Sequence, residues 1–356
     1  MGIEALPVIE NPDGPTHPNA GRIAKLTEVM RISGEHDNFF FKRPSNIKIA
    51  PDGSIFLIDD KQFLRFDKNG RFLGNLHKIG EGPGETTYVW DYFFSKKGIL
   101  IFSGQPRKII ETDLAGNLLR EQRIESKTGI TKNLGIYNDK YWIAFSGLGD
   151  VGENMKGIVD VKLQLGWRTL DGIANDTNLI FIEKIYLNQR KIGNATRRIM
   201  SNLVPAIFAL APDGNLFVSD SQEYSIKQVS LDKEKIVREF KRKYPRVPYS
   251  DETEKEGEKR KSVVPTPKFF NDILKLLFHR ENLWVLTSSI DKRKGILVDV
   301  FSRDGHYADC FYLPIPQVDT TRDLKLKTIA LSTDYLFTVE KDEDENPFLV
   351  KYVLAL

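Results

Sequence analysis

The chain repeats one pattern of hydrophobic and polar positions. The stretch APDGSIFLIDD, Ala50 to Asp60, returns as APDGNLFVSDS, Ala211 to Ser221, with the turn and the hydrophobic run in the same register. Asp-Gly tolerates the positive φ that a tight hairpin turn requires. The pattern therefore predicts a β-hairpin in both places, and its recurrence indicates a fold built from repeats.

Residues Asn46 to Leu76 serve as the template of the repeat. Four short runs, NIKIA, SIFLID, QFLRFD and RFLGNL, are separated by turn residues such as PDG and KNG. Runs of this length between turn signals predict four antiparallel strands joined as a meander. SIFLID is apolar at successive positions rather than alternating, as expected of a sheet that is covered on both faces.

Five further segments follow the same pattern, although the second of them is the poorest match and the last stops one strand short. They are Tyr92–Ile124, Leu134–Leu187, Ala206–Phe240, Ile273–Leu313 and Lys327–Leu356. Arg22–Ile32 alternates as a strand, so we expect it to supply the missing strand and to close a ring without a free sheet edge. The sequence thus predicts an all-β fold, a six-bladed β-propeller of four-stranded antiparallel blades. A lead at 1–21 precedes a single domain at 22–356 with insertions near 146–201 and 244–268.

A family resemblance rests on the first unit. PSNIKIAPDGSIFLIDD, followed by FDKNGRFLGNLHKIGEGPGE, resembles the NHL-type repeat and the bacterial extracytoplasmic six-bladed β-propellers. The resemblance is strong over Arg43–Glu85 and Pro205–Phe240 and weak across Ser146–Ser201. It implies the propeller fold and a periplasmic or secreted location, but it implies no reaction, because propellers host binding modules and enzymes alike.

Composition narrows the partners more than it identifies them. The 356 residues carry 52 Lys+Arg against 49 Asp+Glu, for a formal net charge of +3, which lacks the basic excess typical of a nucleic-acid binder. The single cysteine, Cys310, excludes an internal disulfide. No apolar run is long enough for a membrane-spanning helix, and the first residues lack the basic start and apolar core of a signal peptide.

A first set of candidate residues lies near the start of the predicted inner strands, which should line a central channel. Asn46, Asp91 and Asn133 fall at one equivalent position, with Asp272 close to it in the fifth unit. Converging oxygen side chains could bind Ca²⁺. The gluconolactonase and regucalcin family of propellers, which the chain resembles in this respect, uses such a site. Asn and Asp are also ordinary residues at the start of a strand, so a structural role is the alternative.

A second set lies at the end of the second strand of each unit, and all but one member carry a polar side chain. These residues are Asp59, Gly104, Ser146, Asp220, Thr287 and Glu340. They could form a polar rim for a ligand or simply cap the hairpins by bonding loop amides. Arg43, His77 and Arg107 are further candidates for binding a ligand at the channel mouth, although isolated basic residues are more often solvated.

Two functions follow from these observations. The leading one is a non-catalytic propeller that binds a carbohydrate, peptide or protein at the channel mouth. The alternative is a Ca²⁺-dependent hydrolase or lactonase, in which Asn46, Asp91 and Asn133 hold the metal and Asp272 acts as base. The long insertion Tyr244–Lys268, with its charged centre Asp251–Lys261, is predicted to be a lid over the mouth or a tolerated insertion without a role.

Overall fold

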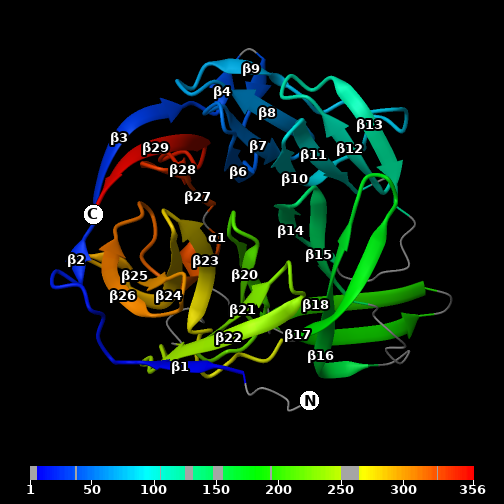
Figure 1. Ribbon diagram of the computed structural model, residues 1–356. Coiled ribbons are helices and arrows are strands. Elements are labelled where there is room, and N and C mark those ends of the chain that lie inside the picture. The colour runs from blue at the N-terminus through cyan, green and yellow to red at the C-terminus, as the bar shows by residue number, and fades with distance from the viewer. Residues whose placement is uncertain are drawn as a thin grey trace.

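Six β-sheets make up nearly all of the structure. The computed structural model describes residues 6–36, 38–104, 106–124, 131–146, 155–192, 195–249, 264–326 and 328–356. Within these ranges one short helix, α1 (Thr321–Leu326), accompanies the strands. The sheets lie around a central opening (Figure 1), and we number them first to sixth in chain order from β6. The predicted all-β fold is confirmed.

The first, second and sixth sheets have four strands each. The first contains β6 (Ser45–Ile49), β7 (Ile55–Asp59), β8 (Gln62–Phe66) and β9 (Phe72–Asn75). The second contains β10 (Val89–Ser95), β11 (Gly98–Ser103), β12 (Lys108–Thr112) and β13 (Leu118–Arg123). The sixth contains β27 (Ile329–Leu331), β28 (Tyr335–Lys341), β29 (Pro347–Ala355) and β3 (Lys25–Ile32).

The third, fourth and fifth sheets have five strands, one more than the repeat predicts. The third contains β14 (Thr131–Tyr137), β15 (Lys140–Phe145), β16 (Lys156–Arg168), β17 (Ala174–Ile192) and β18 (Ala195–Val204). The fourth contains β19 (Ile207–Leu210), β20 (Asn215–Ser219), β21 (Ser225–Ser230), β22 (Lys235–Arg242) and β1 (Val8–Asn11). The fifth contains β23 (Ile273–His279), β24 (Asn282–Asp291), β25 (Gly295–Ser302), β26 (Tyr307–Leu313) and β2 (Arg22–Ile23).

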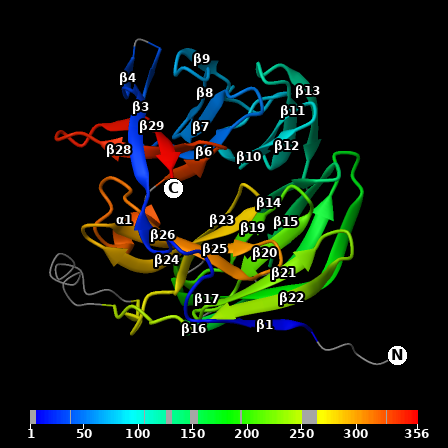
Figure 2. The ribbon, with the colours of Figure 1, turned by 60° about the vertical axis from the view of Figure 1, so that its left-hand side comes forward.

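The N-terminal segment runs along the outer edges of three successive sheets, as Figure 2 shows in dark blue. β1 pairs parallel with β22, β2 pairs parallel with β26, and β3 pairs antiparallel with β29. The sequence assigned all of Arg22–Ile32 to the last unit, but Arg22 and Ile23 join the fifth sheet instead. Part of the predicted lead is also a strand. A short hairpin of β4 (Glu35–His36) and β5 (Phe39–Phe40) then leads to the first sheet.

The third sheet departs most from the template. Where the sequence suggested irregular insertions, the described residues form the long antiparallel strands β16, β17 and β18. β16 alternates exposed and buried positions through much of its length, with Val161 and Leu163 buried. A strand of this period shields one face and presents the other to solvent. This segment matches the repeat template poorly because its strands are longer. The template expects turn residues at the spacing of short strands, so it does not detect them.

The repeated APDG turns have the same hydrogen bonds in both copies. The amide of Gly53 donates to the carbonyl of Ala50 at 2.9 Å, and that of Gly214 donates to Ala211 at 3.1 Å. Both glycines have positive φ, +84° and +80°. At Gly214 a Cβ would also lie 2.2 Å from the Tyr137 ring, so this position requires glycine for its packing as well as for its backbone.

The core lies between neighbouring sheets, and β7 illustrates why. Ile55 and Leu57 pack toward the sixth sheet with Phe337, whereas Phe56 and Ile58 pack toward the second sheet with Tyr92. All five residues of β7 are buried. The successive apolar positions predicted a sheet covered on both faces, and this prediction is confirmed.

The flanks of the long insertion pair with each other. Pro248 and Phe269 form an isolated antiparallel bridge, and the Tyr249 amide donates to the Lys268 carbonyl at 3.0 Å. The charged centre Asp251–Lys261, the proposed lid, lies outside the described residues.

Candidate functional site

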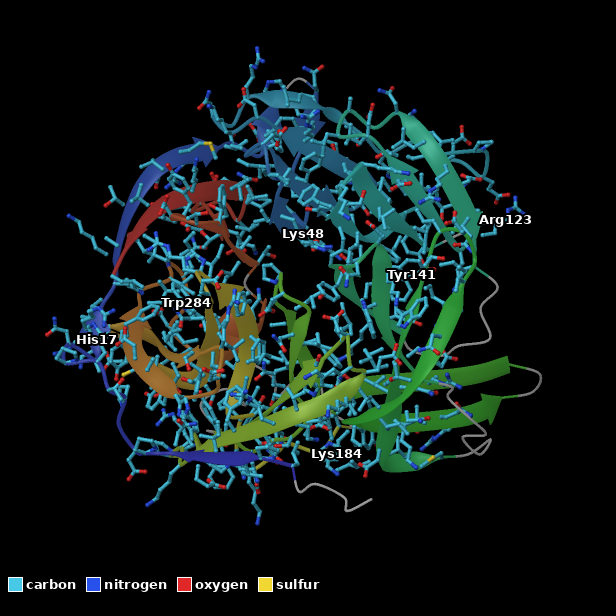
Figure 3. The ribbon with its side chains drawn as sticks, in the orientation of Figure 1. His17, Lys48, Arg123, Tyr141, Lys184 and Trp284 are labelled. Atoms are coloured by element: carbon cyan, nitrogen blue, oxygen red, sulfur yellow. The ribbon has the colours of Figure 1, made fainter. Side chains whose placement is uncertain are left out.

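The residues predicted to start the inner strands come together in part. The Asn46 amide donates to the Asp91 carboxylate at 2.8 Å, and the Lys48 ammonium lies 2.9 Å from the same oxygen, Oδ1. Asn46 adopts the left-handed region, with φ +49°. Figure 3 shows Lys48 at the edge of the central opening. Burial lowers the pKa of Lys48, and the neighbouring Asp91 opposes that shift.

Asn133, the third residue of this set, has a different place. It lies on β14 and lines a cavity between the second and third sheets, described below. Around Asp91 the nearest charged group is therefore the Lys48 ammonium. In the described part of the chain, no group of three or more His, Cys, Asp or Glu side chains is arranged to hold a metal ion.

The second set of predicted residues is engaged within individual sheets. Asp59 accepts the amides of Lys42 at 2.7 Å and Arg43 at 2.6 Å, so it caps the loop that precedes β6. Burial raises the pKa of Asp59, and these two amides oppose the rise. Asp220 pairs with Lys227 at 2.9 Å. Glu340 is buried and accepts the hydroxyls of Thr338 and Tyr352.

The remaining predicted residues are dispersed. Arg43 is exposed. The His77 ring joins two loop carbonyls, that of Lys61 at 2.7 Å and that of Thr86 at 2.9 Å. Asp272 is buried and contacts Arg246 at 3.3 Å. Burial raises the pKa of Asp272, and Arg246 opposes the rise.

Three lysines on inner strands form a pattern that the sequence analysis missed. Lys48 on the first sheet donates to the carbonyl of Tyr92 on the second sheet. Lys132 on the third sheet donates to Ala206, beside the first strand of the fourth, at 2.8 Å. Lys275 on the fifth sheet donates to Ile329 on the sixth at 3.1 Å. Each ammonium thus bridges one sheet to the next. A sequence pattern that could have indicated these residues is a single lysine within an apolar run, as in NIKI and ILKLLF.

A cavity of 290 Å³, which we call the arginine cavity, lies between the second and third sheets. Two predicted residues, Arg107 and Asn133, are among its lining residues. The others that matter chemically are the cations Arg123 and Arg168, the aromatic side chains Trp90, Phe102 and Tyr141, and Gln122. Figure 3 shows Tyr141 on β15 and Arg123 on β13, and both residues line this cavity. None of the described residues that line it is acidic.

Charge and exposure distinguish the parts of the arginine cavity. Arg123 and Trp90 are exposed, with 51% of Trp90 accessible. Arg168 is held by Asp176 at 2.6 Å. The side-chain oxygen of Gln122 is buried and has no hydrogen-bond partner among the described residues. Burial raises the pKa of Tyr141 to about 12, and Arg168 opposes the rise. The cavity therefore offers cations, an unsatisfied amide and aromatic surface.

The comparisons with known proteins agree on the fold. Residues 32–151 match a family model described as a 6-bladed beta-propeller. No curated protein matches the sequence. Among the described residues, no helix is long and apolar enough to cross a membrane.

Solved structures provide similarity over nearly the whole chain. A candidate exported protein from Bacteroides fragilis shares 14% identity, with 99% of this chain and 100% of that chain covered and a TM-score of 0.54. A gluconolactonase from Xanthomonas campestris shares 12% identity, with 99% of each chain covered and a TM-score of 0.47. A luciferin-regenerating enzyme shares 11%, with 93% and 95% covered and a TM-score of 0.47. The family match and the first of these likenesses, with the six sheets of the structure, show that the chain has a six-bladed β-propeller fold.

Proposed function

We propose that this propeller is a non-catalytic binding protein that holds an acidic carbohydrate in the arginine cavity. One observation carries the proposal: the exposed Arg123 lies with three aromatic side chains and the buried Gln122 oxygen in the lining of a single cavity, whose described lining residues include no carboxylate. Sequence analysis placed the ligand at the channel mouth. The cavity between the second and third sheets is better suited, because cationic and aromatic side chains line the same enclosed space there.

The chemistry of the lining favours a sugar that bears a carboxylate. A guanidinium presents paired N–H donors that match the two oxygens of a carboxylate. The exposed ring of Trp90 and the Tyr141 ring offer flat apolar surface for the C–H face of a sugar. The buried oxygen of Gln122 can accept a hydrogen bond from a sugar hydroxyl.

A binding role is favoured over catalysis by the same lining. General acid–base catalysis needs a group whose pKa lies near the working pH. The described lining residues include no His, Asp or Glu, and Tyr141, with its pKa raised to about 12, stays protonated at neutral pH.

For the calcium-dependent hydrolase, the surroundings of Asp91 are unfavourable. The Lys48 ammonium lies 2.9 Å from the Asp91 carboxylate. A Ca²⁺ bound to Asp91 would have to displace this ammonium or lie beside it, and like charges so close repel strongly. We therefore propose that Asn46, Asp91 and Lys48 join the first and second sheets. Equilibrium dialysis should recover no stoichiometric Ca²⁺, and one retained Ca²⁺ per chain would favour the hydrolase.

Calorimetric titration with trigalacturonate tests the binding proposal, with the neutral trigalactoside as its matched comparison. The acidic sugar should bind and the neutral one should bind at least about tenfold more weakly, because charge-assisted hydrogen bonds are lost. Arg123→Gln should weaken trigalacturonate binding by a similar factor, since Arg123 is exposed and lines the cavity. Arg293→Gln, at an exposed arginine remote from the lining, should have no effect. Equal binding of both sugars, or an unaltered affinity in Arg123→Gln, would contradict the proposal.

We also infer that β3 closes the ring of blades. Support comes from its pairing with β29, the last strand of the chain. Deleting residues 1–30 should lower the melting temperature by about 10 °C or more and expose a sheet edge that promotes aggregation. Deleting residues 1–21, which removes β1 but leaves β3, should have a smaller effect. Equal melting temperatures for the two truncated proteins would refute the closure.

An extracytoplasmic location is our third proposal. It is supported by the resemblance of the first repeat to extracytoplasmic propellers and by the similarity in fold to the candidate exported protein from Bacteroides fragilis. Fractionation of cells that express the natural gene tests it: we expect the protein outside the cytoplasm, and recovery in the cytoplasmic fraction would refute it.

A further inference from the structure

A second cavity lies at the inner strands of the fourth and fifth sheets, next to α1. It has a volume of 380 Å³, and we call it the lysine cavity. Figure 1 shows α1 beside β23 near the central opening. The lining comprises Lys275, two amide side chains from Asn202 and Asn271, and apolar groups that include Ile207 and Leu324. It is separate from the arginine cavity and shares no residue with it.

Lys275 differs from the other two inner-strand lysines in its partners. Lys48 pairs with Asp91, and Lys132 pairs with Glu183, so each has a carboxylate as well as a carbonyl. Lys275 has the Ile329 carbonyl and, among the described residues, no carboxylate. One N–H of its ammonium is thus bonded to the protein, and the other two have no acceptor among the described residues. A cation withdrawn from water without a counter-ion is costly.

The cavity has one buried and one exposed amide side chain. Asn271 is buried, and its amide nitrogen donates to the Leu203 carbonyl at 3.1 Å. That bond orients the side chain. Asn202 is exposed and lies at the rim. A ligand that enters beside Asn202 therefore meets amides first and the ammonium on β23 farther in, with apolar side chains around it.

We propose that the lysine cavity binds a small monocarboxylate with a short apolar body, held by its carboxylate on the Lys275 ammonium. One ammonium matches one negative charge, whereas a phosphate dianion would leave a charge unbalanced within largely apolar walls. Ile207, Leu274 and Leu324 fit the hydrocarbon part. The volume is within the range of small-molecule sites. Burial lowers the pKa of Lys275 to about 8, in agreement with a cation that lacks its counter-ion.

Butyrate is the probe, and its binding is measured by calorimetry against the neutral probe 1-butanol and against inorganic phosphate. Butyrate should bind to the full chain, and butanol and phosphate should bind at least about tenfold more weakly. Lys275→Met should lose at least that factor, whereas Lys275→Arg should retain part of the affinity because it keeps the charge. Lys233→Met, at an exposed lysine, should bind butyrate like the unaltered protein.

A second variant keeps the test decisive if Lys275→Met folds poorly. Ile207→Phe narrows the cavity and leaves Lys275 in place, so it should also weaken butyrate binding at least about tenfold. Arg123→Gln should leave butyrate binding unchanged, which separates this proposal from the sugar site. Absence of butyrate binding, tighter binding of phosphate, or unchanged affinity in both Lys275→Met and Ile207→Phe would overturn it.

Discussion

Two neighbouring regions each enclose a cation, but they treat it differently. Between the fourth and fifth sheets, Arg242 contacts Asp299 at 2.8 Å, and the side chains are 7% and 0% exposed. Asp299 also accepts the hydroxyls of Tyr224 at 2.6 Å and Tyr307 at 2.8 Å. In the lysine cavity, Lys275 has a single carbonyl at 3.1 Å and no carboxylate among the described residues.

The presence or absence of a carboxylate partner distinguishes a cation with a structural role, Arg242, from one that is available to a ligand, Lys275. Burial disfavours the charge on Arg242, yet Asp299 and the tyrosines hold its pKa above the usual value. The guanidinium lies over the rings of Tyr224, Tyr244 and Tyr307, so aromatic side chains and a carboxylate surround the charge. Lys275 borders 380 Å³ of space instead. A cation within the fold thus indicates a binding site only when its counter-ion is missing and a cavity adjoins it.

The largest effect should come from removing the counter-ion of Arg242. Asp299→Asn leaves a buried guanidinium without a carboxylate, so the free energy of unfolding should fall by about 3–5 kcal/mol. Urea denaturation measures it. The matched control is Asp334→Asn, which breaks the exposed ion pair with Arg280 and should cost less than about 1 kcal/mol. Equal losses at the two positions would show that the Arg242 region is not the structural centre described here.

Two of the inner-strand lysines, Lys132 and Lys275, should respond differently to the same substitution. Lys132→Met leaves Glu183, whose side chain is 1% exposed, without its ammonium and should reduce the free energy of unfolding by about 2 kcal/mol. Lys275→Met removes a charge that lacks a counter-ion, so stability should stay unchanged or rise by about 1 kcal/mol. Denaturant unfolding of both variants compares them. A loss at Lys275→Met as large as that at Lys132→Met would mean that Lys275 has a counter-ion after all.

Alkaline pH should sharpen the contrast. The pKa of Lys275 is about 8 in the folded protein against 10.5 in the unfolded chain, so between these values the unfolded state binds the extra proton. Above pH 10.5 Lys275 is neutral in both states, so the free energy of unfolding is highest there. It falls as the pH drops to 8, because the unfolded chain takes up the proton first. Relative to Lys275→Met, the unaltered protein should gain about 1–2 kcal/mol between pH 8 and 10.5. A constant difference between the two proteins would contradict the lowered pKa.

A smaller effect is expected at acid pH from His279, at the end of β23. Burial, with Arg280 nearby, lowers the pKa of His279 to about 4, against 6.5 in the unfolded chain. The unfolded state takes up the proton first, so stability falls as the pH drops from 6.5 to 4, by about 1 kcal/mol once partial solvent access is allowed for. His279→Gln should remove this part of the pH dependence. An unchanged acid profile in that variant would assign the loss to other groups.

Sequence reasoning found the sheets because their signals are local. The Gly53 and Gly214 turns and the apolar run of β7 depend on neighbours in the chain, and the structure confirms them. The parallel strands β1 and β2 could not be found in this way. They are too short for periodicity, and their partners β22 and β26 are remote in sequence.

The candidate sites were predicted less well, again for a physical reason. Asn46 and Asp91, two of the three residues predicted to hold a metal, contact each other through a hydrogen bond. The counter-ion of an inner-strand lysine, however, can come from a strand remote in sequence, as when Glu183 on β17 pairs with Lys132 on β14. Position in a repeat unit cannot show which lysine lacks such a partner. Arg123 and Arg168 likewise could not be linked from the sequence, because they belong to neighbouring sheets. Only the packing of those sheets brings them to one cavity.

Direct titration of Lys275 tests the central claim, that this cation lacks a counter-ion and is available to a carboxylate. NMR of the protein labelled with ¹³Cε-lysine gives the pKa of each ammonium, and Lys275→Met identifies the signal. We expect a pKa of about 8 for Lys275 in the unliganded protein and a higher value in the presence of butyrate, because a bound carboxylate favours the charged form. A pKa near 10.5 that butyrate does not alter would contradict the account.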